Sequence, residues 1–413
     1  MIVDTTAHPV APETGRWPGL VVPRGARARV AGAVVDLLVR RLTRRLPLAV
    51  VYPDGTVVGA SEDVPRLILH RPGDFAARVG AAGLIGFGES YMAGDWDAPD
   101  LVAVLTVLAA HVDDLVPRPL ARLRRLHVAG HPAAERNSED NTRRNIGRHY
   151  DLSNDFFGLF LDETMTYSAA LFTGAADDLA DAQRAKIDRL LDRAGVRAGT
   201  RLLEIGTGWG ELAVRAAARG ATVHTVTLST EQQSAALARV AAAGLADRVR
   251  VELLDYRRVT GSYDAVVSVE MIEAVGYDYL DTYFATIDRV LAPGGRAAIQ
   301  AITMPHDRML ATRHTYTWIQ KYIFPGGFLP SVRALEESAA RADLLVREEF
   351  SMGPQYARTL RMWRERFEAA RTEVSALGFD ETFVRMWRLY LAYSEAGFRS
   401  GYLDVGQFVL TRD

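Results

Sequence analysis

The feature that most constrains the fold is a glycine-rich loop near the middle of the chain. In RLLEIGTGWGELAVRAAARG (201–220), an apolar run ends in an acid, Gly206-x-Gly208-x-Gly210 follows, and an alanine-rich helical pattern comes next. A strand that turns through glycines into a helix brings the backbone close to a bound nucleotide. We therefore expect a nucleotide or nucleoside site here, the alternative being a tight turn without a ligand.

Strand-like and helix-like patterns alternate regularly around this loop. The candidate strands are 201–205, 222–227, 249–254, 265–269 and 297–302. This alternation predicts an α/β fold with a doubly wound, Rossmann-like sheet. The 413 residues, 48% of them hydrophobic, are enough for two domains.

The spacing of the glycines narrows the choice of ligand. A dinucleotide fingerprint reads G-x-G-x-x-G and directs a helix N-terminus at a pyrophosphate. Here the third glycine comes one residue earlier, and residues 206–210 contain no lysine or arginine. A nucleoside without phosphates fits better. S-adenosylmethionine is such a cofactor, and E/D-x-G-x-G-x-G is the usual form of its loop.

The ends of the next two strands offer further groups to the cofactor. The segment TVHTVTLSTEQQ presents Thr227, Ser229 and Gln232 where an acid usually takes the ribose hydroxyls. Ser229 could equally be the N-cap of the following helix. After the third strand, Asp255 and Tyr256 could bracket an adenine, although Asp255 could also be an ordinary loop acid.

Composition excludes several kinds of chemistry. The chain has no cysteine, so disulfides, thiolate metal sites and a cysteine nucleophile are excluded. The nine histidines form no HExxH motif, and we expect no metal. A net charge of −2 does not favour a nucleic-acid partner. Only Lys186 and Lys321 are lysines, which we interpret as compositional bias.

The N-terminal part is expected to form a separate small domain. Residues 1–22 are polar and proline-rich and predict a flexible arm. We expect an N-terminal domain at 23–130, with a Pro53-Asp54-Gly55 turn between two strands and an apolar helix near 101–115. The polar segment 131–142 is the expected linker to a catalytic domain at 143–413.

One segment of this N-terminal domain is strongly basic. Asp36 is the single acid among seven arginines, which are Arg24, Arg27, Arg29, Arg40, Arg41, Arg44 and Arg45. The i+4 spacing of Val34, Leu38, Leu42 and Leu46 predicts an amphipathic helix with an arginine-rich opposite face. That face is either a solvated surface or a contact with an anionic membrane, and a second basic cluster at 118–127 favours the membrane.

Several longer motifs resemble one enzyme family. They are HYDLSNDFFGLFLDETMTYSAALF, LLEIGTGWGELA, VTLSTEQQ, VEMIEAVGYDYLDTYF, IQAITMPHDRM and YIFPGGFLPS. Together they resemble the cyclopropane-fatty-acyl-phospholipid and mycolic acid cyclopropane synthases from residue 143 to the C-terminus. GFGESYMAGDWD is similar to the N-terminal domain of the phospholipid-acting members. The chain is most similar to the actinobacterial branch associated with tuberculostearic (10-methylstearic) acid.

The resemblance implies a class I methyltransferase with a helical acyl-binding cap, preceded by a small mixed α+β domain. It implies that a methyl group passes from S-adenosylmethionine to the cis double bond of an unsaturated, oleoyl-type phospholipid chain. Proton loss from the carbocation then gives a 10-methylene product, or a cyclopropane as the alternative. The family places bicarbonate beside the cation as base. A cytoplasmic enzyme associated peripherally with the inner face of the membrane is implied, together with a separate reductase that completes the methyl branch.

Site residues are carried over by position. Glu273 matches the family's catalytic glutamate, which holds the bicarbonate, and Tyr356 matches its catalytic tyrosine. The matched cofactor contacts are Tyr167, Ser168, Glu204, Gly206, Thr207, Gly208, Gly210, Thr227, Leu228, Ser229 and Gln232. Ala169 stands where the family commonly has cysteine, and Gln300, a third catalytic candidate, where it has histidine. These two departures change the residues expected around the bicarbonate. They also leave open the alternative that the chain is a catalytically silent lipid-binding protein.

Overall fold

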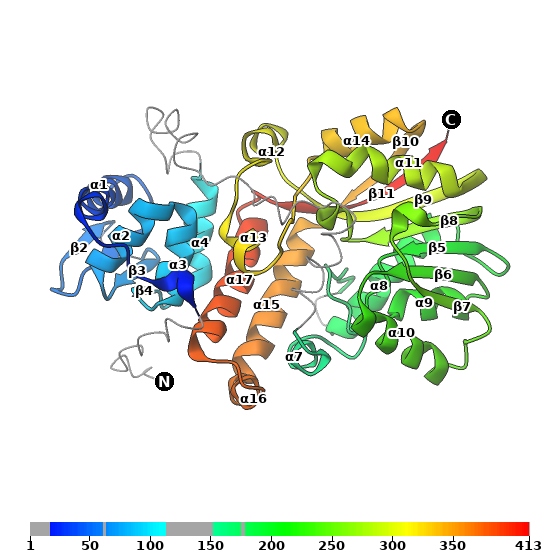
Figure 1. Cartoon of the computed structure of the whole chain (residues 1–413), viewed down its shortest axis with the longest axis horizontal. Coiled ribbons are helices and arrows are strands. Elements are labelled where there is room, and N and C mark those ends of the chain that lie inside the picture. The colour runs from blue at the N-terminus through cyan, green and yellow to red at the C-terminus, as the bar shows by residue number, and fades with distance from the viewer. Residues whose placement is uncertain (1–16, 61–62, 113–151, 175–177, 413) are drawn as a thin grey trace. The chain divides into compact units, whose positions relative to one another are not determined.

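The computed structural model describes residues 17–60, 63–112, 152–174 and 178–412 (Figure 1). The chain divides into two compact units, neither of which is contiguous in sequence. The first contains the elements from η1 to α4 together with α13, α16 and α17, and the second contains the large sheet. The N-terminal unit thus includes helices from the C-terminal third, in contrast to the expected division at 23–130 and 143–413. The expected linker, 131–142, lies outside the described residues.

The first unit is a mixed α+β fold built on a four-stranded sheet of order β2-β1-β3-β4. Its helices are η1 Pro18–Leu20, α1 Ala26–Thr43, α2 Pro72–Ala82, α3 Leu84–Met92, α4 Leu101–Ala110, α13 Trp318–Tyr322, α16 Arg371–Ala376 and α17 Glu381–Arg399. Its strands are β1 Ala49–Val51, β2 Val57–Gly59, β3 Arg66–Leu69 and β4 Trp96–Asp97. The predicted turn joins the antiparallel pair β1–β2, where Gly55 has φ 84°. The second basic cluster, 118–127, lies outside the described residues.

Helix α1 confirms the predicted helix, but a different face of it is buried. Val34 is 45% exposed, whereas Val35 is buried. The contact with α2 is made by small residues, since a Cβ on Gly80 would lie 2.8 Å from the Cβ of Ala31. Strict i+4 spacing drifts around a helix of 3.6 residues per turn. The face that packs therefore follows mixed i+3 and i+4 steps and lies beside the predicted one.

The last residues of the predicted flexible arm are packed, which corrects the prediction of an arm over 1–22. Leu20 is only 2% exposed, and its carbonyl oxygen accepts a hydrogen bond from Arg78. Trp17 Nε1 donates to Asp380 Oδ2 at 2.8 Å. These contacts explain why an apolar residue and a tryptophan occur in an otherwise polar segment. Residues 1–16 lie outside the described part.

Helix α17 packs against α3 and α4 of the first unit, and one of its arginines is hydrogen-bonded there. Arg385 donates to the carbonyl oxygens of Tyr91 and Trp96, and its Nη1 pairs with Asp97 Oδ2 at 3.0 Å. In the same unit, Trp318 of α13 donates to Met92 Sδ at 3.3 Å. Part of the aromatic C-terminal region, from which the sequence predicts an acyl cap, is thus core of the first unit.

The second unit is built on a seven-stranded sheet of order β10-β11-β9-β8-β5-β6-β7. The strands are β5 Arg201–Ile205, β6 Thr222–Thr227, β7 Val249–Leu253, β8 Tyr263–Val269, β9 Leu291–Thr303, β10 Leu344–Ser351 and β11 Asp404–Arg412. Strands β5 to β9 pair in parallel, and β11 runs antiparallel to both neighbours. The five predicted strands are confirmed within a few residues, apart from the early start of β9. Strands β10 and β11 were not predicted.

Helices cover both faces of this sheet (Figure 1). Helices α8 Leu179–Arg193, α9 Glu211–Ala218 and α10 Thr230–Ala242 cover one face, and α11 Leu280–Val290 and α14 Val332–Arg341 cover the other. The other helices of this unit are α7 Asn154–Gly158, η3 Tyr256–Arg258, η4 Ile272–Ala274, η5 Tyr277–Tyr279, α12 His306–Thr312 and α15 Gly353–Ala369. Leu202 packs in the core cluster with α8 and α9, and Leu203 in the cluster with α11 and α14. Because adjacent strand residues point to opposite faces, both are apolar in a sheet covered on both sides. The predicted doubly wound α/β fold is confirmed.

Candidate active site

The glycine loop connects β5 to α9 and forms the floor of a pocket at the carboxyl ends of the parallel strands. Gly206, Gly208 and Gly210 have φ values of 98°, 52° and 88°, all in the left-handed region that glycine tolerates best. A Cβ on Gly208 would meet nothing within 4 Å, whereas one on Gly210 would lie 3.0 Å from Ala236. Gly208 therefore leaves room for a ligand, and Gly210 allows α9 and α10 to approach.

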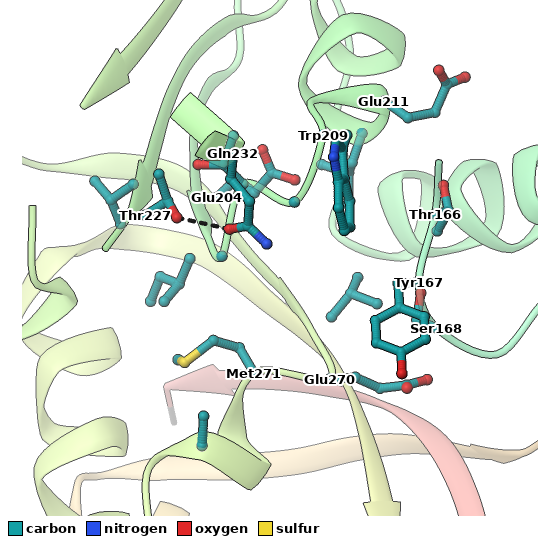
Figure 2. Close-up of a pocket in the computed structure, with 18 of the residues that line it drawn as sticks. Thr166, Tyr167, Ser168, Glu204, Trp209, Glu211, Thr227, Gln232, Glu270 and Met271 are labelled. Carbon is teal, nitrogen blue, oxygen red and sulfur yellow. Dashed lines mark hydrogen bonds between the residues drawn. The ribbon is translucent and has the colours of Figure 1, made fainter. Parts of the chain in front are cut away.

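Most of the predicted cofactor residues line this pocket (Figure 2). They are Tyr167, Ser168, Glu204, Gly206, Thr207, Gly208, Thr227, Leu228, Gln232 and Tyr256. The Thr227 hydroxyl donates to Gln232 Oε1 at 2.8 Å and so orients the amide that lines the pocket. The polar groups come from the ends of β5 and β6, where ligands of open α/β sheets bind.

Three predicted cofactor residues do not line the pocket. Gly210 is a packing position, as described above. Ser229 is the N-cap of α10, where its Oγ accepts a hydrogen bond from Gln232 N at 3.2 Å. Its contacts are thus those of the helix cap that the sequence analysis raised as the alternative to ribose binding. Asp255 caps η3 and pairs with Arg257, whose backbone N–H donates to Asp255 Oδ1 at 2.9 Å. Arg257 neutralises the Asp255 carboxylate and lowers its pKa, against the effect of burial.

Glu204 places a buried carboxyl at the base of the pocket. The side chain is 3% exposed, and its Oε2 has no hydrogen-bond partner among the described residues. Burial raises the pKa of Glu204 to about 8, so the group is a neutral acid at pH 7. An acid with an unused donor or acceptor, beside an open glycine turn, fits a polar ligand such as the nucleoside and amino-acid parts of S-adenosylmethionine.

Aromatic residues form one side of the site. Trp209 lines the pocket, donates to Asn154 Oδ1 at 2.7 Å and lies 5.2 Å from the Phe157 ring. Trp363 of α15 packs 5.2 Å from Tyr167 and 6.3 Å from Phe160. This cluster joins α7 and α15 to the segment that carries Tyr167, and its apolar surface suits a site from which water must be excluded.

Helix α8 holds that segment through two fully buried polar side chains. Gln183 Nε2 donates to the Ser168 carbonyl oxygen at 2.8 Å, and Lys186 Nζ donates to Ser168 Oγ at 2.6 Å. Both side chains have 0% exposure. Burial lowers the pKa of Lys186 to about 8, while Glu270 and Asp162 oppose this change. At pH 7 the lysine therefore keeps its positive charge inside the unit.

Glu270 is the residue that joins the predicted catalytic groups. It directly follows β8 and lines the pocket (Figure 2). Its Oε1 accepts hydrogen bonds from Ala169 N and Gln300 Nε2, both at 2.8 Å, and its Oε2 accepts from the Tyr356 hydroxyl at 2.7 Å. The structure thus brings Gln300 of β9 and Tyr356 of α15 together around a carboxyl group that the sequence analysis did not identify.

Glu273 lies close enough to Glu270 for the two carboxyls to interact. Its Oε1 accepts from Ile302 N at 2.6 Å, and its Oε2 is buried without a partner among the described residues. Burial, assisted by the negative charge of Glu270, raises the pKa of Glu273 to about 8. The raised pKa favours the neutral form of Glu273 at pH 7, as expected for one of two neighbouring, half-buried carboxyls.

Sequence reasoning missed Glu270 and Lys186, and it included Trp209 in the matched loop 204–210 without giving it a role of its own. Each carried a signal: Glu270 is the first residue after a predicted strand, and Lys186 is one of only two lysines in an arginine-rich chain. Trp209 lies inside the glycine loop itself. The sequence does not reveal that Glu270 meets Ala169 and Tyr356, because these residues are 101 and 86 positions away.

The strand order, the antiparallel β11 and the glycine loop after β5 define a class I S-adenosylmethionine-dependent methyltransferase. The family model for mycolic acid cyclopropane synthetase matches residues 137–408. The chain belongs to this family.

Proteins that are similar in sequence or structure agree with this family assignment. The chain is 57% identical over 424 residues to the tuberculostearic acid methyltransferase UfaA1 of Mycobacterium tuberculosis, covering 100% of this chain and 99% of the relative. It is 37% identical to the cyclopropane-fatty-acyl-phospholipid synthase of Escherichia coli strain K12, covering 86% and 90%. The solved structure of mycolic acid cyclopropane synthase CmaA1 with SAH and CTAB superposes with a TM-score of 0.61 at 34% identity, covering 65% of this chain and 97% of that one.

Within the part of the chain that the structure describes, no helix is long and apolar enough to cross a membrane.

Proposed function

We propose that this protein methylates the cis double bond of unsaturated, oleoyl-type acyl chains in phospholipids and forms a 10-methylene product. The observation that carries the proposal is the 57% identity, over the full length of both chains, to a tuberculostearic acid methyltransferase. A pocket that fits the cofactor, with a carboxyl cluster on its wall, supplies the chemistry such a reaction needs.

S-adenosylmethionine supplies a methyl group bound to a positively charged sulfur. In this chain, Glu204, Thr207 and Gln232 would hold its polar parts, and Trp209 and Tyr256 would pack against its rings. Tyr167 and Ser168 lie on the same side of the pocket as Glu270 (Figure 2), which makes this side the place for the reacting carbons.

The alkene π electrons form the new C–C bond as the methyl–sulfur bond breaks with its electron pair left on sulfur. A hydride then moves, with its pair, from the methylated carbon to the neighbouring cationic carbon. Finally, a methyl C–H bond breaks, its pair forms the exomethylene double bond, and a base takes the proton. The protein must align the alkene and exclude water, which would otherwise trap the cation. A separate reductase would complete the methyl branch.

Cyclopropane formation on the same substrate is the second candidate, because the Escherichia coli relative is a cyclopropane-fatty-acyl-phospholipid synthase. Both products require the loss of one proton. They differ in which carbon carries the charge when the proton leaves.

The test is gas chromatography–mass spectrometry of fatty acids from a host supplied with oleate and expressing this chain alone. A 10-methylene C19 chain supports the proposal, and a cyclopropane C19 chain supports the second candidate. If no C19 species forms with purified protein that binds S-adenosylmethionine, the proposed function is wrong.

We also propose that α1 is the contact with the membrane that carries the substrate. Val30, Val34 and Leu37 are 67%, 45% and 66% exposed and share one face of the helix. Exposed arginines lie on and after the same helix, at positions 29, 41, 44 and 45. An apolar stripe with basic residues beside it is typical of helices that lie in the interface of an anionic bilayer.

Cosedimentation with vesicles containing anionic lipid tests this contact. Substitution of Val30, Val34 and Leu37 by serine should abolish binding, whereas Leu237→Ser, at a leucine of α10 that is 47% exposed, should leave it unchanged. Equal binding of both variants would refute a role for α1.

A further inference from the structure

The hydrogen-bond donors around Glu270 all bind its side chain, which takes the place that a separate anion would occupy. Ala169 N and Gln300 Nε2 can only donate, and both point to Glu270 Oε1 at 2.8 Å. Tyr356 donates to the other oxygen. The three hydrogen bonds donated to Glu270 and the positive charge of Lys186 favour its carboxylate form.

The backbone at Glu270 is held in an unfavourable conformation. Its φ of 46° lies in the left-handed region, which costs a residue with a side chain about 1 kcal/mol or more. The neighbouring hydrogen bonds hold this conformation, since Glu270 N donates to the Gln300 carbonyl oxygen at 2.8 Å. A strained backbone that directs a carboxylate to a pocket wall is a feature of functional positions.

A bicarbonate ion does not fit this arrangement. Three of the groups that would surround it, Ala169 N, Gln300 and Tyr356, are already bound to Glu270. Glu273, which the resemblance gives as its holder, offers one oxygen without a partner among the described residues. A second anion beside the Glu270 carboxylate would be repelled by it, and Lys186 supplies only one buried positive charge. The residues of this site therefore do not fit bicarbonate, which is the base that the family resemblance implies.

We propose that the Glu270 carboxylate is the base of this enzyme and takes the place of bicarbonate. This inference rests on the proposed function, because it assigns the proton acceptor of that reaction. The methyl C–H bond of the cation breaks, its electron pair forms the new C=C bond, and the proton goes to a Glu270 oxygen. Burial raises the pKa of Glu270, which makes it a better proton acceptor than a solvated glutamate.

Bicarbonate dependence tests the assignment without any substitution. Purified wild-type protein is assayed on dioleoylphosphatidylglycerol vesicles with S-adenosylmethionine in argon-sparged, CO2-free buffer, with C19 products measured by mass spectrometry. We expect turnover within twofold of that in buffer containing bicarbonate. A tenfold or larger loss in CO2-free buffer, restored by adding bicarbonate, would overturn the proposal.

Glu270→Gly is the informative variant, because glycine accepts the backbone conformation at this position and removes the whole side chain with its carboxylate. We expect it to fold, to bind S-adenosylmethionine as the wild type does, and to lose at least about 100-fold in turnover in CO2-free buffer. Added bicarbonate should then restore part of the activity, because Ala169 N, Gln300 and Tyr356 are released. The control is Glu349→Gln at an exposed glutamate of β10, which should keep wild-type turnover.

The outcomes separate the two proposals. If Glu270→Gly turns over within threefold of the wild type in CO2-free buffer, Glu270 is not the base, and the proposed function stands. An effect of bicarbonate that is larger on the wild type than on Glu270→Gly would lead to the same conclusion. If the wild type forms no C19 product although it binds the cofactor, the proposed function fails, and this inference fails with it.

Discussion

The neutral acid at Glu204 leads to a quantitative prediction about stability. Its pKa is near 8 in the folded chain and near 4.5 in the unfolded chain, because burial disfavours the charged form. The folded value lies above the unfolded value. The stabilising contribution of the protonated acid is therefore complete below pH 4.5 and is lost as the pH rises towards 8. In this range each pH unit lowers the free energy of unfolding by about 1.4 kcal/mol.

Glu204→Gln tests this linkage, because glutamine resembles the protonated acid and does not titrate. Between pH 6 and 7.5 the variant should gain about 2 kcal/mol relative to the wild type. For a cooperative unit of this size, that corresponds to a relative rise in Tm of roughly 4–8 °C. Thermal melts of both proteins without S-adenosylmethionine measure the difference directly. A difference in Tm that stays constant from pH 6 to 7.5 would refute the raised pKa.

Three further substitutions in the same unit have predicted effects. Gly208→Ala should fold with a loss of only about 1 kcal/mol, the strain of its left-handed backbone, but bind S-adenosylmethionine at least about tenfold more weakly in calorimetry, because its methyl group would enter open pocket space. Gly210→Ala should instead lower stability by about 1–3 kcal/mol in thermal or denaturant unfolding, because its Cβ would clash with Ala236 in a left-handed backbone; the reverse order of effects would contradict the two roles. Lys186→Met should move the rising limb of the pH–activity profile to higher pH, because the positive charge that lowers the pKa of Glu270 is removed. An unchanged profile at reduced turnover would indicate that Lys186 only supports the local fold.

The sequence alone was enough to predict strands β5 to β9 of the large sheet and the glycine loop after β5. Runs such as RLLEI at 201–205 and TVHTVT at 222–227 combine apolar and β-branched residues, as is common in parallel strands covered on both faces, and the glycines fix the turn between β5 and α9. Strand β10 was not predicted because charges interrupt its apolar residues, as in VREEF at 346–350. Strand β11, DVGQFVLTR, was not predicted because Gly406 and Gln407 interrupt its apolar residues, although both are buried. Local pattern also could not show that α17 packs with the N-terminal unit, since Arg385 and Asp97 are 288 positions apart.

Motifs identified Glu273, Gln300 and Tyr356 as catalytic candidates, but they did not predict how these residues are arranged. Sequence determined which side chains the chain carries and which of them end a strand, because those properties are local. Only the tertiary structure decided that Glu270, and not Glu273, receives the hydrogen bonds of Ala169, Gln300 and Tyr356. It also decided that Lys186 lies buried in the same network. The reason is physical: hydrogen bonding and pKa depend on distance and burial, which are set by how remote segments pack.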